Sequence, residues 1–377
     1  MAPGTDIRVV GTDAEREVFI RLPWRIHKGH RAWVPPLLSD ERRLFDPSRN
    51  PAFSYCDATL ALLYRDGVPC GRIMGVINRR YNAHVHQSIA RFGCLECPND
   101  RDVAGGLLRY VEEWARSRGM AKIVGPMGFT DQDPEGYLVE GFEHEPTIAT
   151  YANFPFMNEL MTLCGYTKET DYVVYKVRVP PSIPGVYQRV IDRAASGGHV
   201  RILEFRRRSQ LKPYARRILS LMNETFADLY GYAPLDEREM EEAGRRFLPI
   251  LDPRFVKFAT VDGDDAGFVL AMPNLDEGLR RANGRLFPLG ALRIIAAARR
   301  TKQLDLLVGG VRQKYRSYGL AVIGLAMILQ SARNAGMEMI DSHLELETNV
   351  RMRAEMDRLG GELVKRYRIY RKVFRDP

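Results

Sequence analysis

The sequence of 377 residues has few cysteines and no long hydrophobic run, and both absences narrow what it can be. The longest uninterrupted apolar run, 320–329, is about half as long as the ~20 residues that a transmembrane helix needs. The segment 1–19 carries acidic residues throughout and has no apolar core, so we expect no secretory signal there. These features predict a cytoplasmic protein without a membrane span.

The cysteines number five, and all of them lie in the N-terminal half. An odd count without an export signal predicts reduced thiols instead of a disulfide framework. Cys94 and Cys97 form a lone CxxC pair, whereas a structural zinc site needs a second pair. We therefore expect no bound metal.

Positive charge is in excess, with 56 Lys and Arg against 47 Asp and Glu and a formal net charge of +9. The excess is concentrated in 274–303, with seven basic and two acidic residues, and in 350–377, with nine and four. Such segments predict a surface for an anion, whether phosphate, nucleic acid or anionic lipid. No recognised nucleic-acid motif is present, so nucleic acid is not expected as a partner.

The chain is too long for one compact domain and predicts two. Each half has the pattern hairpin, strand, helix, strand, helix, strand, which is typical of an α/β fold built around one sheet. A segment rich in Pro and Gly separates the halves and encloses a short helical stretch. The predicted division is a first domain over 1–178, a linker over 179–198 and a second domain over 199–377.

The most informative motif lies where a strand over 304–309 leads through a basic loop into a helix over 319–334. Its residues are Arg316-x-x-Gly319-x-Ala321. Amides at a helix N-terminus are unpaired and, with the helix dipole, bind anions. Small residues leave room for the anion to approach, and Arg312 and Lys314 add positive charge. A helix N-terminus beside a solvated basic loop is the alternative.

This motif resembles the acyl-CoA pyrophosphate loop of the GNAT superfamily, written Gln/Arg-x-x-Gly-x-Gly/Ala. The resemblance covers nearly the whole chain and implies two tandem GNAT-like domains, each a central mixed sheet flanked by helices. In the first half the corresponding segment, 98–102, is acidic and lacks the motif. The resemblance therefore implies an acyl-CoA site in the second domain only. The residues that it assigns to acyl-CoA are Val311, Arg312, Arg316, Ser317, Tyr318, Gly319, Leu320, Ala321 and Asn349.

A second GNAT signature, an Asn that begins a helix ending in Leu-Gly-aromatic, is matched in part. Asn349 follows the next strand, and Leu359-Gly360 closes the next helix. Gly361 stands where an aromatic residue is usual. Met356 stands where many members carry the Tyr that protonates the leaving thiolate, so the resemblance does not assign the general acid.

GNAT chemistry is the attack of an amine on a thioester. An alkylammonium has a pKa of about 10, so a base must first remove its proton. Three candidate bases, His343, Glu345 and Glu347, are two residues apart on the strand before Asn349, so alternation places them on one face. We favour Glu347 as the base, then Glu345, then His343; a solvated sheet edge is the alternative. A backbone amide within 309–311 is expected to hold the developing oxyanion.

Several segments, among them Leu22-Pro23-Trp24-Arg25-Ile26, resemble the bacterial ceramide synthases, which transfer a long acyl chain from acyl-CoA to a sphingoid amine. The resemblance implies a lipid amine as acceptor. The insert 274–303, with apolar residues flanked by Arg and Lys, suits peripheral contact with an anionic inner membrane or a lid over an acyl chain; a packed amphipathic helix is the alternative. Two other functions stay open, an N-acetyltransferase of hydrophilic small-molecule or peptide amines and a non-catalytic acyl-CoA or lipid-binding module.

Two further features carry weaker expectations. The acidic and aromatic loop 128–150 can receive a cationic amine, although as an isolated feature it is more often a solvated acidic loop. His27 and His30 are interpreted as residues of local packing or solvent contact.

Overall fold

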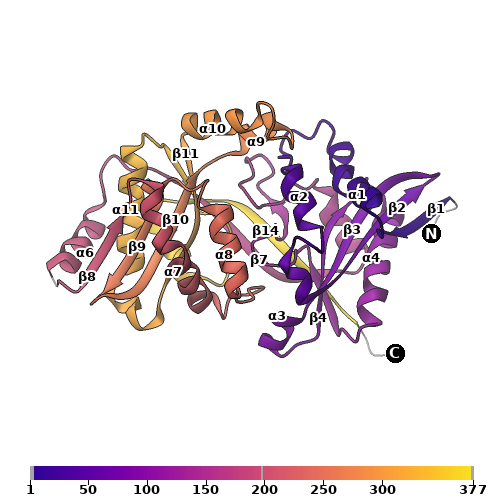
Figure 1. The fold of residues 1–377 in the computed structure, drawn as a ribbon, viewed down its shortest axis with the longest axis horizontal. Coiled ribbons are helices and arrows are strands. Elements are labelled where there is room, and N and C mark those ends of the chain that lie inside the picture. The colour runs from indigo at the N-terminus through magenta and orange to yellow at the C-terminus, as the bar shows by residue number, and fades with distance from the viewer. Residues whose placement is uncertain (1–3, 197, 375–377) are drawn as a thin grey trace. The chain divides into compact units, whose positions relative to one another are not determined.

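The computed structural model describes residues 4–196 and 198–374. Its contacts divide the chain into two compact units. Unit 1 comprises Met1–Val173, Leu275–Ala296 and Val364–Pro377, and unit 2 comprises Val174–Asn274 and Ala297–Leu363. Figure 1 labels the helices and strands, and each unit is an α/β structure in which helices flank a mixed sheet.

Unit 1 holds a sheet with the strand order β1-β2-β3-β4-β5-β14-β7, and β6 pairs with β14. The pairing of β4 with β5 is parallel, whereas β14 runs antiparallel to β5. The strands are β1 (Thr5–Val9), β2 (Cys56–Arg65), β3 (Val68–Asn78), β4 (Ile89–Glu96), β5 (Lys122–Gly125), β6 (Tyr137–Glu140), β7 (Thr167–Arg178) and β14 (Glu362–Val373). The helices are α1 (Asp13–Ile26), α2 (Leu38–Leu44), η1 (Pro51–Ser54), α3 (Arg79–Val85), α4 (Arg101–Arg116), α5 (Phe156–Leu163) and α9 (Asp276–Ala282); α10 (Gly290–Arg300) begins there.

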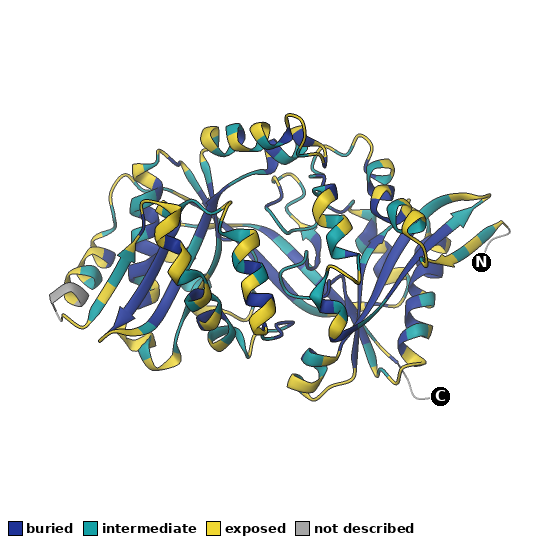
Figure 2. Cartoon of the chain, in the orientation of Figure 1, coloured by how far each residue is buried: buried dark blue, intermediate teal, exposed yellow. Residues whose placement is uncertain are grey.

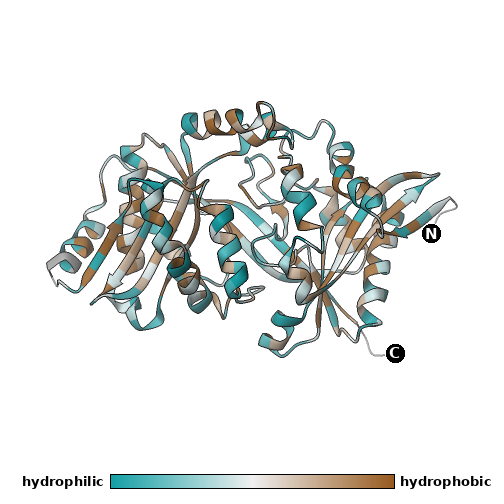
Figure 3. Cartoon of the chain, in the orientation of Figure 1, coloured by the Kyte–Doolittle hydropathy of each residue, from teal (hydrophilic) through white to brown (hydrophobic). Residues whose placement is uncertain are grey.

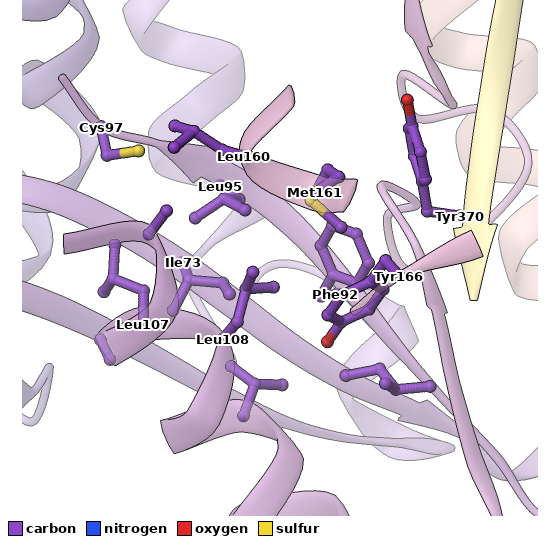
Figure 4. Close-up of a cluster of buried hydrophobic side chains, with 14 of the residues drawn as sticks. Ile73, Phe92, Leu95, Cys97, Leu107, Leu108, Leu160, Met161, Tyr166 and Tyr370 are labelled. Atoms are coloured by element: carbon purple, nitrogen blue, oxygen red, sulfur yellow. The ribbon is translucent and has the colours of Figure 1, made fainter. Parts of the chain in front are cut away.

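The core of unit 1 forms where α4 covers the sheet. Val103, Leu107 and Val111 recur every four residues, so they lie on one face of the helix and are fully buried. They join side chains of β3, β4 and α5 in a continuous apolar cluster (Figure 4). Figure 2 shows the same pattern over the unit, with buried residues along the strands and on the inner helix faces.

Unit 2 continues from the second half of β7, and its strand order is β7-β12-β11-β10-β9-β8. The strands are β8 (Val200–Glu204), β9 (Val256–Val261), β10 (Asp264–Pro273), β11 (Gln303–Val311) and β12 (Met339–Asp341), with a short β13 (Glu345–Leu346). The helices are α6 (Gly185–Ser196), α7 (Arg208–Phe226), α8 (Glu237–Phe247), η2 (Pro253–Phe255), η3 (Gln313–Tyr318), α11 (Leu320–Asn334) and α12 (Val350–Arg358).

Unit 2 buries both faces of its sheet. Phe258 packs with α7 and α8 on one face, while its neighbour Ala259 packs with α11 on the other. This is the alternation of a strand that is covered on both sides.

The contact-based units differ from the division drawn from the sequence in three segments. The expected linker 179–198 contains α6, whose Val190 and Ile191 pack against the α11 core, so it is part of unit 2. The C-terminal strand belongs to unit 1, because β14 pairs with β5 and β6 and buries Tyr367. Most of the insert 274–303 also belongs to unit 1, where Trp24 Nε1 donates to Asn283 Oδ1 at 2.9 Å.

The strand predicted over 337–346 is interrupted. β12 ends at Asp341, and His343 has a positive φ of 58° that no extended strand accommodates. The chain resumes as β13 for Glu345 and Leu346 only. The expectation that three alternating residues share one strand face is therefore wrong, because the backbone turns between them.

Candidate functional site

The strand, basic loop and helix predicted over 304–334 form a continuous feature of unit 2. β11 ends at Val311, η3 covers Gln313–Tyr318, and α11 begins after Gly319. Gly319 has φ 72°, a left-handed conformation that costs a non-glycine residue energy. The backbone turn that leads into α11 therefore requires the glycine of the motif.

The N-terminus of α11 is suited to an anion. Among the residues that the structure describes, no side chain caps it, and its first turn contains no acidic residue. Its first amides therefore have no intrahelical acceptor and point out of the helix end. Leu320 is buried and anchors the turn, while Ala321 is exposed beside those amides.

The basic residues of the loop divide into two groups. Arg312 is fixed by Glu224, with Nε to Oε2 at 2.7 Å, and its Nη1 donates to the carbonyl of Asp265 at 2.7 Å. Lys314 donates to Asp264 at 2.9 Å. Arg316 is exposed and makes no ion pair within the described chain. Arg316 is consequently the basic side chain best able to reach a bound phosphate.

The strands beside this loop separate. β11 pairs with β12 only from Gln303 to Asp305, and β12 ends there, although β11 continues to Val311. A register shift against β10, where Leu270 faces Val308 and Ala271 faces Leu306, makes Leu307 an extra residue. A bulge of this kind re-aims the backbone that follows it. The expected oxyanion amides of 309–311 come directly after it.

Glu345 stands in an environment that suits proton transfer. Burial raises the pKa of Glu345 to about 7, an effect that a hydrogen bond from Asn349 Nδ2 to its Oε2 at 3.1 Å only partly offsets. A carboxylate with a pKa near the working pH can accept a proton and release it again. Asn349 also caps α12 by accepting from the Met352 amide at 3.3 Å, so its side chain orients Glu345.

The other two predicted bases are placed differently. The backbone carbonyl of Glu347 accepts from Arg353 Nη1 at 2.8 Å. The amide of His343 donates to Asp341 Oδ1 at 2.9 Å in the turn between β12 and β13. Of the three predicted bases, the structure thus shows a hydrogen bond with Asn349 for Glu345.

None of the protein-family models compared with the chain matches it. Among curated proteins, "Bacterial ceramide synthase" of Caulobacter vibrioides is 27% identical over 97% of this chain and 96% of its own length. "Protein YghO" of Escherichia coli is 24% identical over 94% and 92%.

Solved structures agree on the architecture. A tandem GNAT protein from the clavulanic acid biosynthesis pathway matches with a TM-score of 0.56 and 13% identity over 99% of both chains. The chain has a tandem GNAT fold. A GCN5-related N-acetyltransferase from Sphaerobacter thermophilus is also similar, with a TM-score of 0.50 and 14% identity over 100% of this chain and 98% of that one.

The two units of the tandem GNAT fold differ at one helix N-terminus. The helices compared are α4, which follows β4, and α11, which follows β11. In unit 1, Asp100 caps α4 by accepting from the amides of Asp102 at 2.9 Å and Val103 at 3.2 Å. Its carboxylate thus satisfies first-turn amides whose counterparts in α11 have no side-chain cap, and Arg65 Nη2 donates to that carboxylate at 2.8 Å. In the sequence, this difference between the two units is visible as the acidic segment 98–102.

Sequence reasoning missed Tyr175, a buried tyrosine whose hydroxyl contacts Arg353 of α12. Tyr175 on β7 is 2% exposed, its amide donates to Ser342 Oγ at 2.9 Å, and its hydroxyl accepts from Arg353 Nε at 3.1 Å. Met356 on α12 is buried and offers no proton. A tyrosine far away in the sequence, on a different strand, gave no local pattern that relates it to α12.

Proposed function

We propose that this chain is an acyl-CoA-dependent N-acyltransferase that transfers a long acyl chain to the amine of a sphingoid base. The supporting observation is the contrast between its two helix N-termini. The anion site is open at α11 and filled by Asp100 at α4, in a chain similar over its full length to a bacterial ceramide synthase. One acyl-CoA therefore binds, in unit 2.

The acyl-CoA pyrophosphate rests on the first amides of α11, with Arg316 beside it. Gly319 and Ala321 leave this backbone open because neither extends a side chain over it. Val311, Arg312, Ser317, Tyr318 and Leu320 form the rest of the loop, and Arg312 is already held in place by Glu224. Anion binding by main-chain amides at such a helix end needs no metal.

Glu345 accepts the proton of the acceptor ammonium, and Asn349 orients it. The neutral amine attacks the thioester carbonyl, forming the C–N bond. Backbone amides after the β11 bulge stabilise the oxyanion. The C–S bond then breaks and CoA leaves as a thiolate that takes up a proton. We assign the hydroxyl of the buried Tyr175, which accepts from Arg353 Nε at 3.1 Å, as the source of that proton.

The segment 286–300 contacts an anionic membrane. Four apolar residues of this segment are unusually exposed: Phe287 at 85%, Leu289 at 52%, Leu292 at 63% and Ile295 at 49%. Figure 3 shows the apolar residues of α10 beside hydrophilic ones. No helix of the described residues is long and apolar enough to cross a membrane, so the contact is peripheral. Arg285, Arg293, Arg299 and Arg300 add the positive charge that anionic lipid attracts.

Product analysis by mass spectrometry tests this function. Wild type with palmitoyl-CoA and sphinganine should form the N-acyl product, and with acetyl-CoA and a hydrophilic amine it should not. Ala321→Glu places a carboxylate at the exposed first turn of α11 and should weaken palmitoyl-CoA binding at least tenfold. This variant is preferable to a change at Gly319, whose positive φ would strain any other residue.

Arg101→Glu is the matched control, because Arg101 is exposed in the first turn of the capped α4. It should bind palmitoyl-CoA like wild type. Equal affinity in wild type and Ala321→Glu would contradict the acyl-CoA site. Acetylation of a hydrophilic amine without acylation of sphinganine would contradict the lipid acceptor.

A further inference from the structure

Arg353 on α12 joins two parts of unit 2 that the proposed reaction uses. Its Nε donates to the Tyr175 hydroxyl at 3.1 Å, and its Nη1 donates to the Glu347 carbonyl at 2.8 Å. A guanidinium is planar and carries only donors, so two contacts through different nitrogens fix its plane as well as its position. Arg353 thus links the strand that carries Tyr175 to the segment between Glu345 and Asn349.

The backbone of Tyr175 is fixed next to the same segment. Its amide donates to Ser342 Oγ at 2.9 Å, and its carbonyl accepts from the Ser342 amide at 2.9 Å. β7 also pairs with both β12 and β13, the strands on either side of the turn at His343. The phenol ring therefore extends from a backbone whose position is set together with that of β13, on which Glu345 lies.

The hydroxyl proton of Tyr175 has no acceptor among residues 4–196 and 198–374. The oxygen accepts from Arg353, and a donor that occupies one lone pair leaves the O–H group free to donate elsewhere. Since Tyr175 is 2% exposed, bulk solvent does not supply an acceptor. Buried tyrosine hydroxyls usually have a partner for their proton, so this proton is available to an atom of a bound substrate.

The positive charge of Arg353 suits the loss of that proton. The hydrogen bond to Tyr175 is the main reason why the pKa of Arg353 is raised, so the guanidinium stays charged. When the hydroxyl gives up its proton, the phenolate that remains lies against this cation. An opposite charge within hydrogen-bond distance stabilises an anion more than a neutral donor does.

We propose that Arg353 is a positioning residue that orients the Tyr175 hydroxyl toward the leaving sulfur and stabilises the phenolate that forms. This assignment rests on the proposed function, in which CoA leaves as a thiolate. As the C–S bond breaks, its electron pair stays on sulfur. The O–H bond of Tyr175 then breaks and an S–H bond forms, and water returns a proton to the phenolate after CoA has left. Arg353 itself gives up no proton.

A double-mutant cycle in kcat tests this role, with palmitoyl-CoA and sphinganine or whichever amine the wild type acylates. Tyr175→Phe and Arg353→Gln should each lower kcat about tenfold or more, while KM and the Kd of palmitoyl-CoA stay close to those of wild type. If Arg353 acts through Tyr175, the double variant should be no slower than Tyr175→Phe, because the second change removes nothing further. Arg353→Lys keeps a charged donor and should recover part of the lost rate.

Arg351→Gln is the matched control. Arg351 is exposed on the same helix, two residues before Arg353 and thus on a different face, because an α-helix has about 3.6 residues per turn. The kcat of this variant should match that of wild type. Melting curves by circular dichroism check that each variant is folded.

Two results would overturn the role of Arg353 even where wild type acylates sphinganine. One is an unchanged kcat in Arg353→Gln. The other is a double variant in which the two losses multiply, because Arg353 would then only hold the segment between β13 and α12 in place. A wild type that acylates no amine would instead overturn the proposed function, and the role of Arg353 with it.

Discussion

At the scale of single residues, Glu345 illustrates how a carboxyl group obtains a useful pKa. The cost of desolvation favours its neutral form, and the single hydrogen bond from Asn349 partly restores the charged form. The balance places the pKa at about 7. From the sequence alone we favoured Glu347. It lies two residues beyond Glu345 and was expected on the same strand face. That preference has now moved to Glu345.

The pH dependence of turnover tests Glu345. A base works when deprotonated, so turnover should rise as the pH increases through about 7 and level off above it. Glu345→Gln should lower kcat about a hundredfold or more and abolish that rise, while palmitoyl-CoA affinity survives. Steady-state rates between pH 5.5 and 8.5, with a separate binding titration, measure both.

Glu347→Gln is the matched control and should stay within a few-fold of wild type. If Glu347→Gln loses activity and Glu345→Gln keeps it, the base is Glu347 as first favoured. If neither loses activity, the proton leaves through His343 or water.

At the scale of elements, α10 and the loop before it have more exposed apolar surface than packing within unit 1 explains. Phe287 at 85% and Leu292 at 63% exposure are costly in water unless something covers them. The structure also shows which basic residues are committed elsewhere. Arg280 forms an ion pair with Glu145, and Arg281 forms one with Glu277 at 2.5 Å. The remaining exposed arginines are the ones to change.

Liposome flotation tests this contact. Wild type should float with anionic vesicles at low salt and be released at high salt, since each Arg near an anionic surface contributes about 1 kcal/mol and that attraction is screened. Arg285/Arg299/Arg300→Glu should stay in solution. Arg238/Arg245/Arg246→Glu changes three exposed arginines of α8, alters the net charge equally and should still float.

Two outcomes would change the interpretation. If wild type ignores anionic vesicles but acylates dispersed sphinganine, the insert is a lid over the acyl chain. Release of the α8 variant to the same degree would mean that net charge, and not this segment, controls membrane binding.

At the scale of the whole molecule, buried carboxyl groups in unit 1 tie its stability to pH. The loop 128–150 is only partly the solvated loop that its composition allowed, because Glu135 is 4% exposed and burial raises its pKa to about 8. Burial also raises the pKa of Asp131 and of Glu41 to about 7. In the unfolded chain such groups ionise near pH 4. The folded state therefore holds protons that the unfolded state has lost, and stability falls as the pH rises from about 4.5 through about 8.

Glu135→Gln should reduce the loss of stability that occurs as the pH rises. The amide keeps an acceptor for the Tyr172 hydroxyl, which donates to Glu135 Oε2 at 2.7 Å, and cannot ionise. Relative to wild type, we expect a melting temperature at pH 8.5 higher by about 3 °C or more, with little difference at pH 5. Glu143→Gln, an exposed carboxylate of the same loop, is the control and should follow wild type. Parallel curves for wild type and Glu135→Gln from pH 5 to 9 would contradict the buried neutral carboxyl.

The sequence by itself determined the features that depend on residues close together in the chain. The helical spacing of apolar residues predicted α4 and α11, and turn residues predicted the hairpins. The order of the predicted helices and strands indicated a tandem α/β fold, which the structure confirms. The motif from Arg316 to Ala321 and its lack in the acidic segment before α4 could both be recognised in the sequence, because helix capping depends on neighbours within a few residues. Local chemistry was enough for these.

Only the tertiary structure decided what depends on residues far apart in the chain. The last strand joins unit 1 through pairing with β5 and β6, which no pattern within 362–373 reveals. The turn at His343 separates residues that simple alternation would align. The packing expected for His27 and His30 is confirmed, but its partners Glu96 and Phe154, from β4 and the segment before α5, are distant in the sequence. Burial sets the proton affinities of Glu345 and Glu135, and burial is a property of the folded chain alone.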